Sequence, residues 1–129
     1  MAERSVAFDN MRRALLAYVQ AIPFAAVVEV QAIAGALNIP ARHAAYILSR
    51  LSIDETDLCP WHRVVPRNGV FSGGRKSSSR TALQIALLRH EGVPFADDVR
   101  IDLGRATLWR PPDTYRTTFW ADYEGDAIT

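Results

Sequence analysis

Cys59 is the single cysteine of this 129-residue chain, and three histidines are its other obvious groups for nucleophilic or acid–base chemistry. One cysteine excludes an internal disulfide framework and a cysteine-rich zinc site. A lone cysteine with apolar flanks is typical of a small buried hydrophobic residue rather than of an activated thiolate. We therefore expect no metal and no cofactor, and a reduced, cytoplasmic protein.

Basic side chains are concentrated in the middle of the chain. Residues 40–90 hold eight basic and three acidic side chains, residues 1–39 are neutral, and residues 91–129 hold four basic and eight acidic side chains. Such a basic block predicts a surface that binds a polyanion such as nucleic acid. Arginines that are solvated, or that pair with the acidic end, explain the same pattern. Charge alone leaves both interpretations open.

The composition is that of one globular domain. Hydrophobic residues make up 49% and charged residues 22% of the chain, which excludes wholesale disorder. The longest apolar run, 22–28, contains Pro23 and is too short to span a bilayer. The polar, acid-containing start of the chain is unlike a secretory signal. We expect neither membrane contact nor secretion.

The elements that must position any site begin with three helices. Residues 6–21 form an amphipathic pattern that Pro23 ends, and a short β-branched stretch covers 27–30. Helices are then predicted over 31–37 and 41–51, joined by a tight turn at residues 38–40, in the manner of a helix-turn-helix. The third helix has an apolar stripe of Ala44, Ile47, Leu48 and Leu51.

The second half of the chain alternates loops with short elements. Residues 52–58 are acidic and loop-like, and 58–65 are predicted to be extended. A further helix is expected over 81–90, with Leu83, Ala86, Leu87 and His90 on one face. Residues 99–103 and 106–109 predict a β-hairpin around Gly104-Arg105.

The segment Pro60-Trp61-His62-Arg63-Val64-Val65 is followed by Gly69 and by Ser72-Gly73-Gly74. Pro40 lies 21 residues before Trp61, and the chain continues to a Glu91-Gly92-Val93 helix end. Together these residues resemble the DNA-binding domain of the O6-alkylguanine-DNA alkyltransferases, or methylated-DNA–protein-cysteine methyltransferases, whose signature is Pro-Cys-His-Arg-Val. The chain looks most like their alkyltransferase-like relatives, which carry tryptophan or alanine in place of the acceptor cysteine. The resemblance covers roughly residues 8–112.

This resemblance implies an α+β fold, namely a small winged helix-turn-helix domain of the alkyltransferase C-terminal type with a β-hairpin wing. The domain is expected over residues 1–112, followed by an acidic tail over 113–129. In that family the recognition helix enters the minor groove, and the damaged guanine is flipped into a pocket beside the signature loop. The implied lesion pocket of this chain consists of Trp61, His62, Arg63, Val64, Phe71, Ser72 and Gly73.

Trp61 stands where the resemblance places the acceptor cysteine. An indole is not a nucleophile at neutral pH, so we expect lesion binding without alkyl transfer. In an extended segment Cys59 would face the same side as Trp61, but about 6–7 Å away by strand rise. An in-line alkyl transfer does not tolerate a nucleophile that is misplaced by this distance. Trp61 itself either stacks on the flipped base or plugs the vacant pocket, and the sequence leaves both open.

His62 and Glu91 match family residues that help to ionise the cysteine through water. With the cysteine absent, we expect them to persist as buried polar structure, with His62 bonded to a carboxylate or to the backbone. Arg63 is expected to tie carbonyl groups or a carboxylate together through its planar guanidinium.

Two departures from the family pattern concern DNA recognition. The family has a tyrosine where this chain has Val30, and the spacing from Pro40 puts Ala44 where the family has an arginine finger. Arg42 and His43 are close to that position, but one or two helix positions turn a side chain by about 100–200°. The residues expected along the DNA are Val30, Gln31, Arg42, His43, Ala44, Arg50, Arg67, Arg75, Lys76 and Arg80.

The sequence therefore predicts a non-enzymatic, monomeric protein that flips O6-alkylguanine in double-stranded DNA and flags it for nucleotide excision repair proteins. The alternative is a DNA-binding or protein-interaction module on the same fold that has lost lesion specificity. A methyltransferase that uses Cys59 is a third possibility, and each of the three predicts a different outcome with alkylated DNA.

Overall fold

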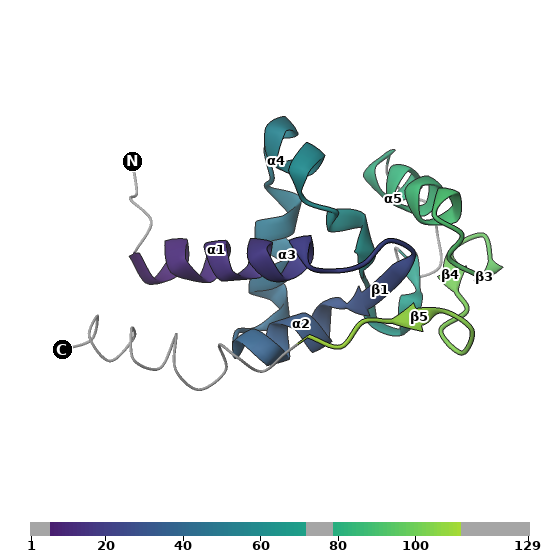
Figure 1. The fold of residues 1–129 in the computed structure, drawn as a ribbon, viewed down its shortest axis with the longest axis horizontal. Helices are drawn as coiled ribbons and strands as arrows, with labels where there is room; N and C mark the ends of the chain where they lie inside the picture. Colours follow the sequence, from purple (N-terminus) through teal and green to yellow (C-terminus); the bar gives the residue numbers. More distant parts are fainter. Residues whose placement is uncertain (1–5, 72–78, 112–129) are drawn as a thin grey trace.

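A computed structural model describes residues 6–71 and 79–111 (Figure 1). The helices are α1 (Val6–Gln20), α2 (Val30–Leu37), α3 (Ala41–Ser49), α4 (Ile53–Leu58) and α5 (Ser79–His90). The strands are β1 (Ala26–Glu29), β2 (Val64–Val65), β3 (Phe95–Asp97), β4 (Arg100–Ile101) and β5 (Thr107–Leu108), with 3-10 turns η1 (Trp61–Arg63) and η2 (Arg67–Gly69). The proposed tail over 113–129 lies outside the described residues.

Helices α2 and α3 form the predicted helix-turn-helix. Asn38 ends α2 in the left-handed conformation with φ 59°, and its N–H donates to carbonyl groups of the last turn. Asparagine tolerates this conformation better than most residues. Ile39 is buried in the turn, and Pro40 precedes the first residue of α3. The turn therefore has a fixed geometry that sets α3 against α2.

Two hydrophobic clusters meet at the strand pair β1–β2. These strands are parallel, with Val28 opposite Val64 and Glu29 opposite Val65. Val28 and Val64 pack into the cluster with α1, α2 and α3, whereas Val27 and Val65 pack into the cluster with α5. Successive side chains of a strand point to opposite faces, so this pair divides the domain. Figure 1 shows α5, β3 and β4 together on the side of β1 away from α1.

The β-hairpin predicted between residues 99–103 and 106–109 is wrong, because these two segments do not pair with each other. The antiparallel pair is β3 with β4, in which Phe95 lies opposite Ile101. β5 instead pairs in parallel with the other edge of β1, where Ala26 lies opposite Thr107. Turn residues at Gly104-Arg105 marked a chain reversal, but local pattern does not show which strand receives the returning segment. The three-stranded sheet thus has the order β2-β1-β5.

Two helical predictions also need correction. The segment predicted as an acidic loop contains α4, which begins with a capping box: Ser52 Oγ accepts from the Glu55 N–H and Glu55 accepts from the Ser52 N–H. In α5 the buried residues are Ile85 and Leu88, whereas Leu83 is 52% exposed. Apolar residues occur on both sides of this helix, so its periodicity did not select the buried face.

No helix within residues 6–71 and 79–111 is long and apolar enough to cross a membrane.

Candidate nucleic-acid interface and its pocket

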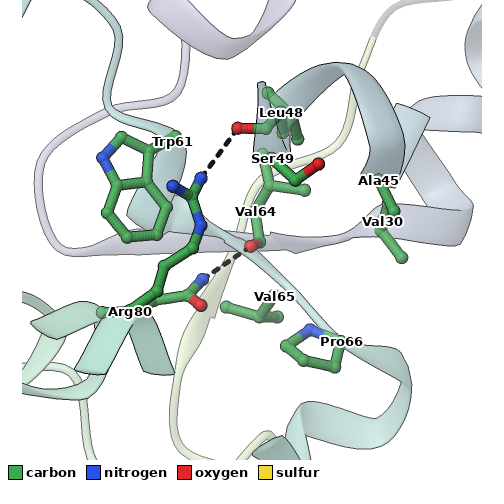
Figure 2. Close-up of a pocket in the computed structure, with 10 residues that line it drawn as sticks. Val30, Ala45, Leu48, Ser49, Trp61, Val64, Val65, Pro66 and Arg80 are labelled. Carbon is green, nitrogen blue, oxygen red and sulfur yellow. Dashed lines mark hydrogen bonds between the residues drawn. The ribbon is translucent and has the colours of Figure 1, made fainter. Parts of the chain in front are cut away.

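A cavity of about 220 Å³ lies beside Trp61, between α3 and the start of α5 (Figure 2). Most of its walls are apolar, and the polar groups come from Ser49, Arg80 and Gln84. A concave apolar site with a few polar groups is the usual form of a small-ligand site. Its lining residues are Val30, Ala45, Leu48, Ser49, Trp61, Val64, Val65, Pro66, Arg80 and Gln84.

Trp61 opens η1, whereas the sequence predicted an extended segment. The Trp61 N–H donates to the Cys59 carbonyl at 2.7 Å, and Arg63 N–H donates to the Pro60 carbonyl at 3.0 Å. The chain therefore turns here, and the alternation expected to place Cys59 on the Trp61 side does not apply. Cys59 is 2% exposed within the cluster of α1, α2 and α3. Burial raises the pKa of its thiol to about 11, which keeps it protonated and unreactive.

The Glu91 carboxylate accepts hydrogen bonds from three residues. His62 Nε2 lies 2.6 Å from Glu91 Oε2, and Arg63 donates through Nε at 3.0 Å to Oε1 and through Nη2 at 2.9 Å to Oε2. The Ala25 N–H adds a bond of 2.9 Å to Oε1. These contacts match the expected structural roles of His62 and Arg63.

The same cluster ties three segments of the chain together. Arg63 Nη1 donates to the Ile22 carbonyl at 2.7 Å, and Ala25 is held at φ 67° while its N–H reaches Glu91. A left-handed alanine costs free energy that surrounding contacts must offset. The Glu91 cluster, comprising Glu91, His62, Arg63 and Ala25, therefore fixes the segment between α1 and β1 against η1 and the end of α5.

The side chain of Glu91 is 7% exposed. Burial alone would raise its pKa, but hydrogen bonds from Arg63, His62 and the Ala25 N–H outweigh that effect and lower the pKa to about 2. Glu91 is therefore a carboxylate at neutral pH, and its charge is matched by the Arg63 guanidinium.

Arg80 closes the cavity from the α5 side. Its guanidinium carbon lies 4.1 Å from the centroid of the Trp61 ring, and Nη2 donates to the Leu48 carbonyl at 2.7 Å (Figure 2). Burial lowers the pKa of Arg80, yet an arginine remains charged in a protein. The sequence placed Arg80 among the phosphate contacts, and nothing there indicated that it covers Trp61.

Gln84 is a structural residue that the sequence did not indicate. Its amide Nε2 donates to the His62 carbonyl at 3.1 Å and to the Val64 carbonyl at 2.9 Å. It lies one helical turn after Arg80, so both residues share one face of α5. That spacing was the available signal, but the choice of Leu83 and Leu87 as the buried face concealed it.

The predicted lesion pocket divides into several parts. Trp61 and Val64 line the cavity, whereas His62 and Arg63 belong to the Glu91 cluster. Phe71 is a correction, because it is 1% exposed in the second hydrophobic cluster and stacks on Phe95 with ring centroids 6.3 Å apart. Ser72, Gly73, Arg75 and Lys76 lie outside the described residues.

The prediction that Ala44 of α3 lies along the DNA, at the position of the family's arginine finger, is also wrong. Ala44 is 0% exposed within the core, as its place in the apolar stripe required, so it does not contact DNA. Its neighbour Ala45 is exposed and lines the cavity. Arg42 is also exposed and lies on the same helix face as Ala45, since residues three apart share a face.

The other predicted DNA contacts are on the surface, with Val30 as the exception. Gln31, His43, Arg50 and Arg67 are exposed, and the Arg50 guanidinium lies 5.2 Å from the Tyr46 ring centroid. Val30 is half-buried and lines the cavity. The described residues contain no group of three or more His, Cys, Asp or Glu side chains placed to hold a metal ion.

Comparison with known proteins identifies a family and several similar structures, two of which are described here. The model of the 6-O-methylguanine DNA methyltransferase DNA-binding domain matches residues 10–93. The structure of S. pombe Atl1 with damaged DNA containing O6-carboxymethylguanine is 27% identical, with a TM-score of 0.67, over 84% of this chain and 100% of that one. The structure of S. pombe ATL with DNA has the same coverage at 24% identity and a TM-score of 0.68, which shows the fold alone. No curated protein sequence matches the chain.

Proposed function

The chain belongs to the family of the 6-O-methylguanine DNA methyltransferase DNA-binding domain, and from this we propose that it binds O6-alkylguanine in duplex DNA without removing the alkyl group. The observation that carries the proposal is that Trp61 forms a wall of the cavity, because the resemblance of Pro60-Trp61-His62-Arg63-Val64 to the family signature places the acceptor cysteine at this residue. A similar structure was solved with O6-carboxymethylguanine in its DNA, which supports the same class of ligand.

The lining of the cavity has the chemistry that a flipped base with an apolar substituent would need. Leu48, Val64 and Val65 supply apolar wall, and Trp61 supplies an aromatic face. Stacking of a base on such a face is worth about 1–3 kcal/mol, and an added alkyl group gains about 0.8 kcal/mol for each buried CH₂. A damaged base also costs less to extrude than a paired one.

Exposed basic residues on and near α3 would hold the duplex. Arg42 lies on the same face of α3 as Ala45, which lines the cavity, and Arg67 lies on η2 beyond Pro66. Contacts of this kind go to phosphates and carry no sequence information. The complex would leave the lesion in place, so the proposed consequence is recruitment of excision repair.

Binding without transfer makes a direct chemical prediction. After incubation of the protein with a duplex containing O6-methylguanine, the intact mass of the protein should be unchanged, because Trp61 accepts no alkyl group and Cys59 is buried with a raised pKa. The control is Cys59→Ser, which should bind the duplex as the wild type does. Gain of the mass of one methyl group, absent in Cys59→Ser, would contradict the proposal.

A second candidate is a DNA-binding module without lesion specificity. It is favoured by the position of Arg80, which covers Trp61, and by the burial of Ala44 at the predicted finger position. This candidate predicts equal affinity for damaged and undamaged duplexes and a steep loss of affinity with salt.

A further inference from the structure

Arg80 holds a position that a planar ligand of Trp61 would need. Trp61 borders two hollows, one lined by Val64 and Val65 and the other by Leu51 and Leu83, and Arg80 lines both. Nevertheless Trp61 is only 7% exposed. The guanidinium is flat and lies over the ring at 4.1 Å, so it covers the aromatic face on which a base would stack.

The Arg80 guanidinium is held there by a second contact. Leu48 lies in the last turn of α3, where carbonyl groups have no partner within the helix and the helix dipole favours a cation. Arg80 Nη2 donates to the Leu48 carbonyl at 2.7 Å. If the side chain withdrew, that carbonyl would face the open cavity and bind water. Withdrawal of Arg80 therefore leaves no buried polar group without a hydrogen-bond partner.

The volume of the cavity agrees with this occupancy. About 220 Å³ is below the range of about 300–1,000 Å³ that is usual for small-ligand sites. Movement of Arg80 away from Trp61 would enlarge the space and join it to the hollow beside Leu83, which Arg80 also lines.

We propose that Arg80 is the internal competitor of the flipped base: it occupies the stacking position on Trp61 in the free protein and must leave before a nucleobase enters. This inference rests on the proposed function for the identity of the base, but not for the position of Arg80. A base is retained only when its contacts exceed those of the guanidinium with Trp61 and with the Leu48 carbonyl. Arg80 thereby sets the affinity of the pocket.

The test uses Arg80→Met, which keeps an unbranched stem and removes the planar cation. Affinity for a duplex with one O6-methylguanine should become about tenfold tighter, in keeping with the strength of a cation–π contact. Affinity for the undamaged duplex should fall slightly, because Arg80 is among the basic residues expected along the DNA and the substitution removes its charge.

The matched control is Arg89→Met on the same helix. The Arg89 guanidinium lies 4.2 Å from the Phe95 ring centroid and donates to the Asp97 carbonyl at 3.1 Å, which is the same pair of contacts away from the cavity. The Arg89→Met variant should leave the affinities for the lesion duplex and for the undamaged duplex unchanged. Weaker or unchanged lesion binding by Arg80→Met would overturn the inference, since the guanidinium would then be a ligand of the base or only a structural link.

A second measurement needs no DNA. In a Trp109→Phe/Trp120→Phe background, Trp61 is the remaining tryptophan of the three, and Arg80→Met should raise its acrylamide quenching constant at least twofold. Unchanged quenching would overturn the inference even if lesion binding were established. Raised quenching without lesion preference in the wild type would instead contradict the proposed function. Should Arg80→Met fail to fold, Arg80→Lys keeps the charge but offers no flat face and is expected to act in the same direction.

Discussion

Glu91→Gln should lower the free energy of unfolding by about 3–5 kcal/mol, the usual cost of breaking a buried ion pair by removing one partner. The glutamine side chain has one oxygen and presents an amide N–H group to donors that now bond a carboxylate. Arg63 would lose its counter-ion, while its side chain stays only 15% exposed. The Ala25 N–H, in its left-handed conformation, would lose its acceptor. Chemical denaturation followed by circular dichroism measures the change.

Glu55→Gln is the matched control. Glu55 also pairs with an arginine, Arg12, and a hydrogen bond from Arg12 lowers the pKa of Glu55 to about 2. Its side chain is 31% exposed, however, whereas that of Glu91 is 7% exposed. We expect the Glu55 substitution to cost far less, because solvent replaces the lost contacts. Equal losses in the two variants would show that burial of the Glu91 cluster contributes nothing.

The Glu91 cluster also predicts an acid dependence. The folded pKa of Glu91, about 2, is below its ordinary value of 4.5. The corresponding stability is therefore present above pH 4.5 and is lost as the pH falls toward 2, by about 3 kcal/mol in all. The wild type should lose stability through this window, and Glu91→Gln should lose less over the same window. Parallel curves for the two proteins would contradict the assignment.

Trp61→Ala should reduce the preference for a lesion duplex over an undamaged duplex by tenfold or more, since base–aromatic stacking is worth about 1–3 kcal/mol by alanine substitution. Affinity for undamaged DNA should change little, because the phosphate contacts are elsewhere. Trp61→Phe retains an aromatic face and should keep part of the preference. Both are measured by fluorescence anisotropy with paired duplexes at one salt concentration.

Trp109→Phe is the control for a general effect of tryptophan loss. Trp109 packs against Tyr18 at a ring-centroid distance of 6.1 Å and does not line the cavity beside Trp61. It should leave the preference intact. If Trp61→Ala folds, by circular dichroism, and keeps the full preference, then Trp61 is a plug of the vacant pocket rather than a stacking surface.

Much of the fold was predictable because its signals are local. The helix-turn-helix follows from Asn38, Pro40 and the apolar stripe that contains Ala44 and Ile47, and the structure confirms it. The capping box of α4 was also present as Ser52 and Glu55, but the acidic composition of 52–58 suggested a loop. The strand partners of β1 were not predictable in this way, because pairing between Ala26 and Thr107 joins distant segments.

The site shows the same division between local and distant information. The motif identified Trp61, and the expectation that Arg63 binds a carboxylate is met by Glu91. The position of Arg80 over Trp61 depends on how α5 packs against η1 and α3. The periodicity of α5 did not define that packing, since Leu83 and Ile85 compete for the buried face. Ala44 was misplaced by counting from Pro40, although its apolar surroundings already indicated the core.

The proposed function requires the pocket to distinguish O6-alkylguanine from guanine. Its most direct test is fluorescence anisotropy of the wild-type chain with two duplexes that differ by a single O6-methylguanine, at one salt concentration near physiological. We expect tighter binding of the methylated duplex by tenfold or more, or about 1.4 kcal/mol. Equal affinity for the two duplexes would contradict it and leave a DNA-binding module without lesion specificity, and binding to neither would indicate a partner other than DNA.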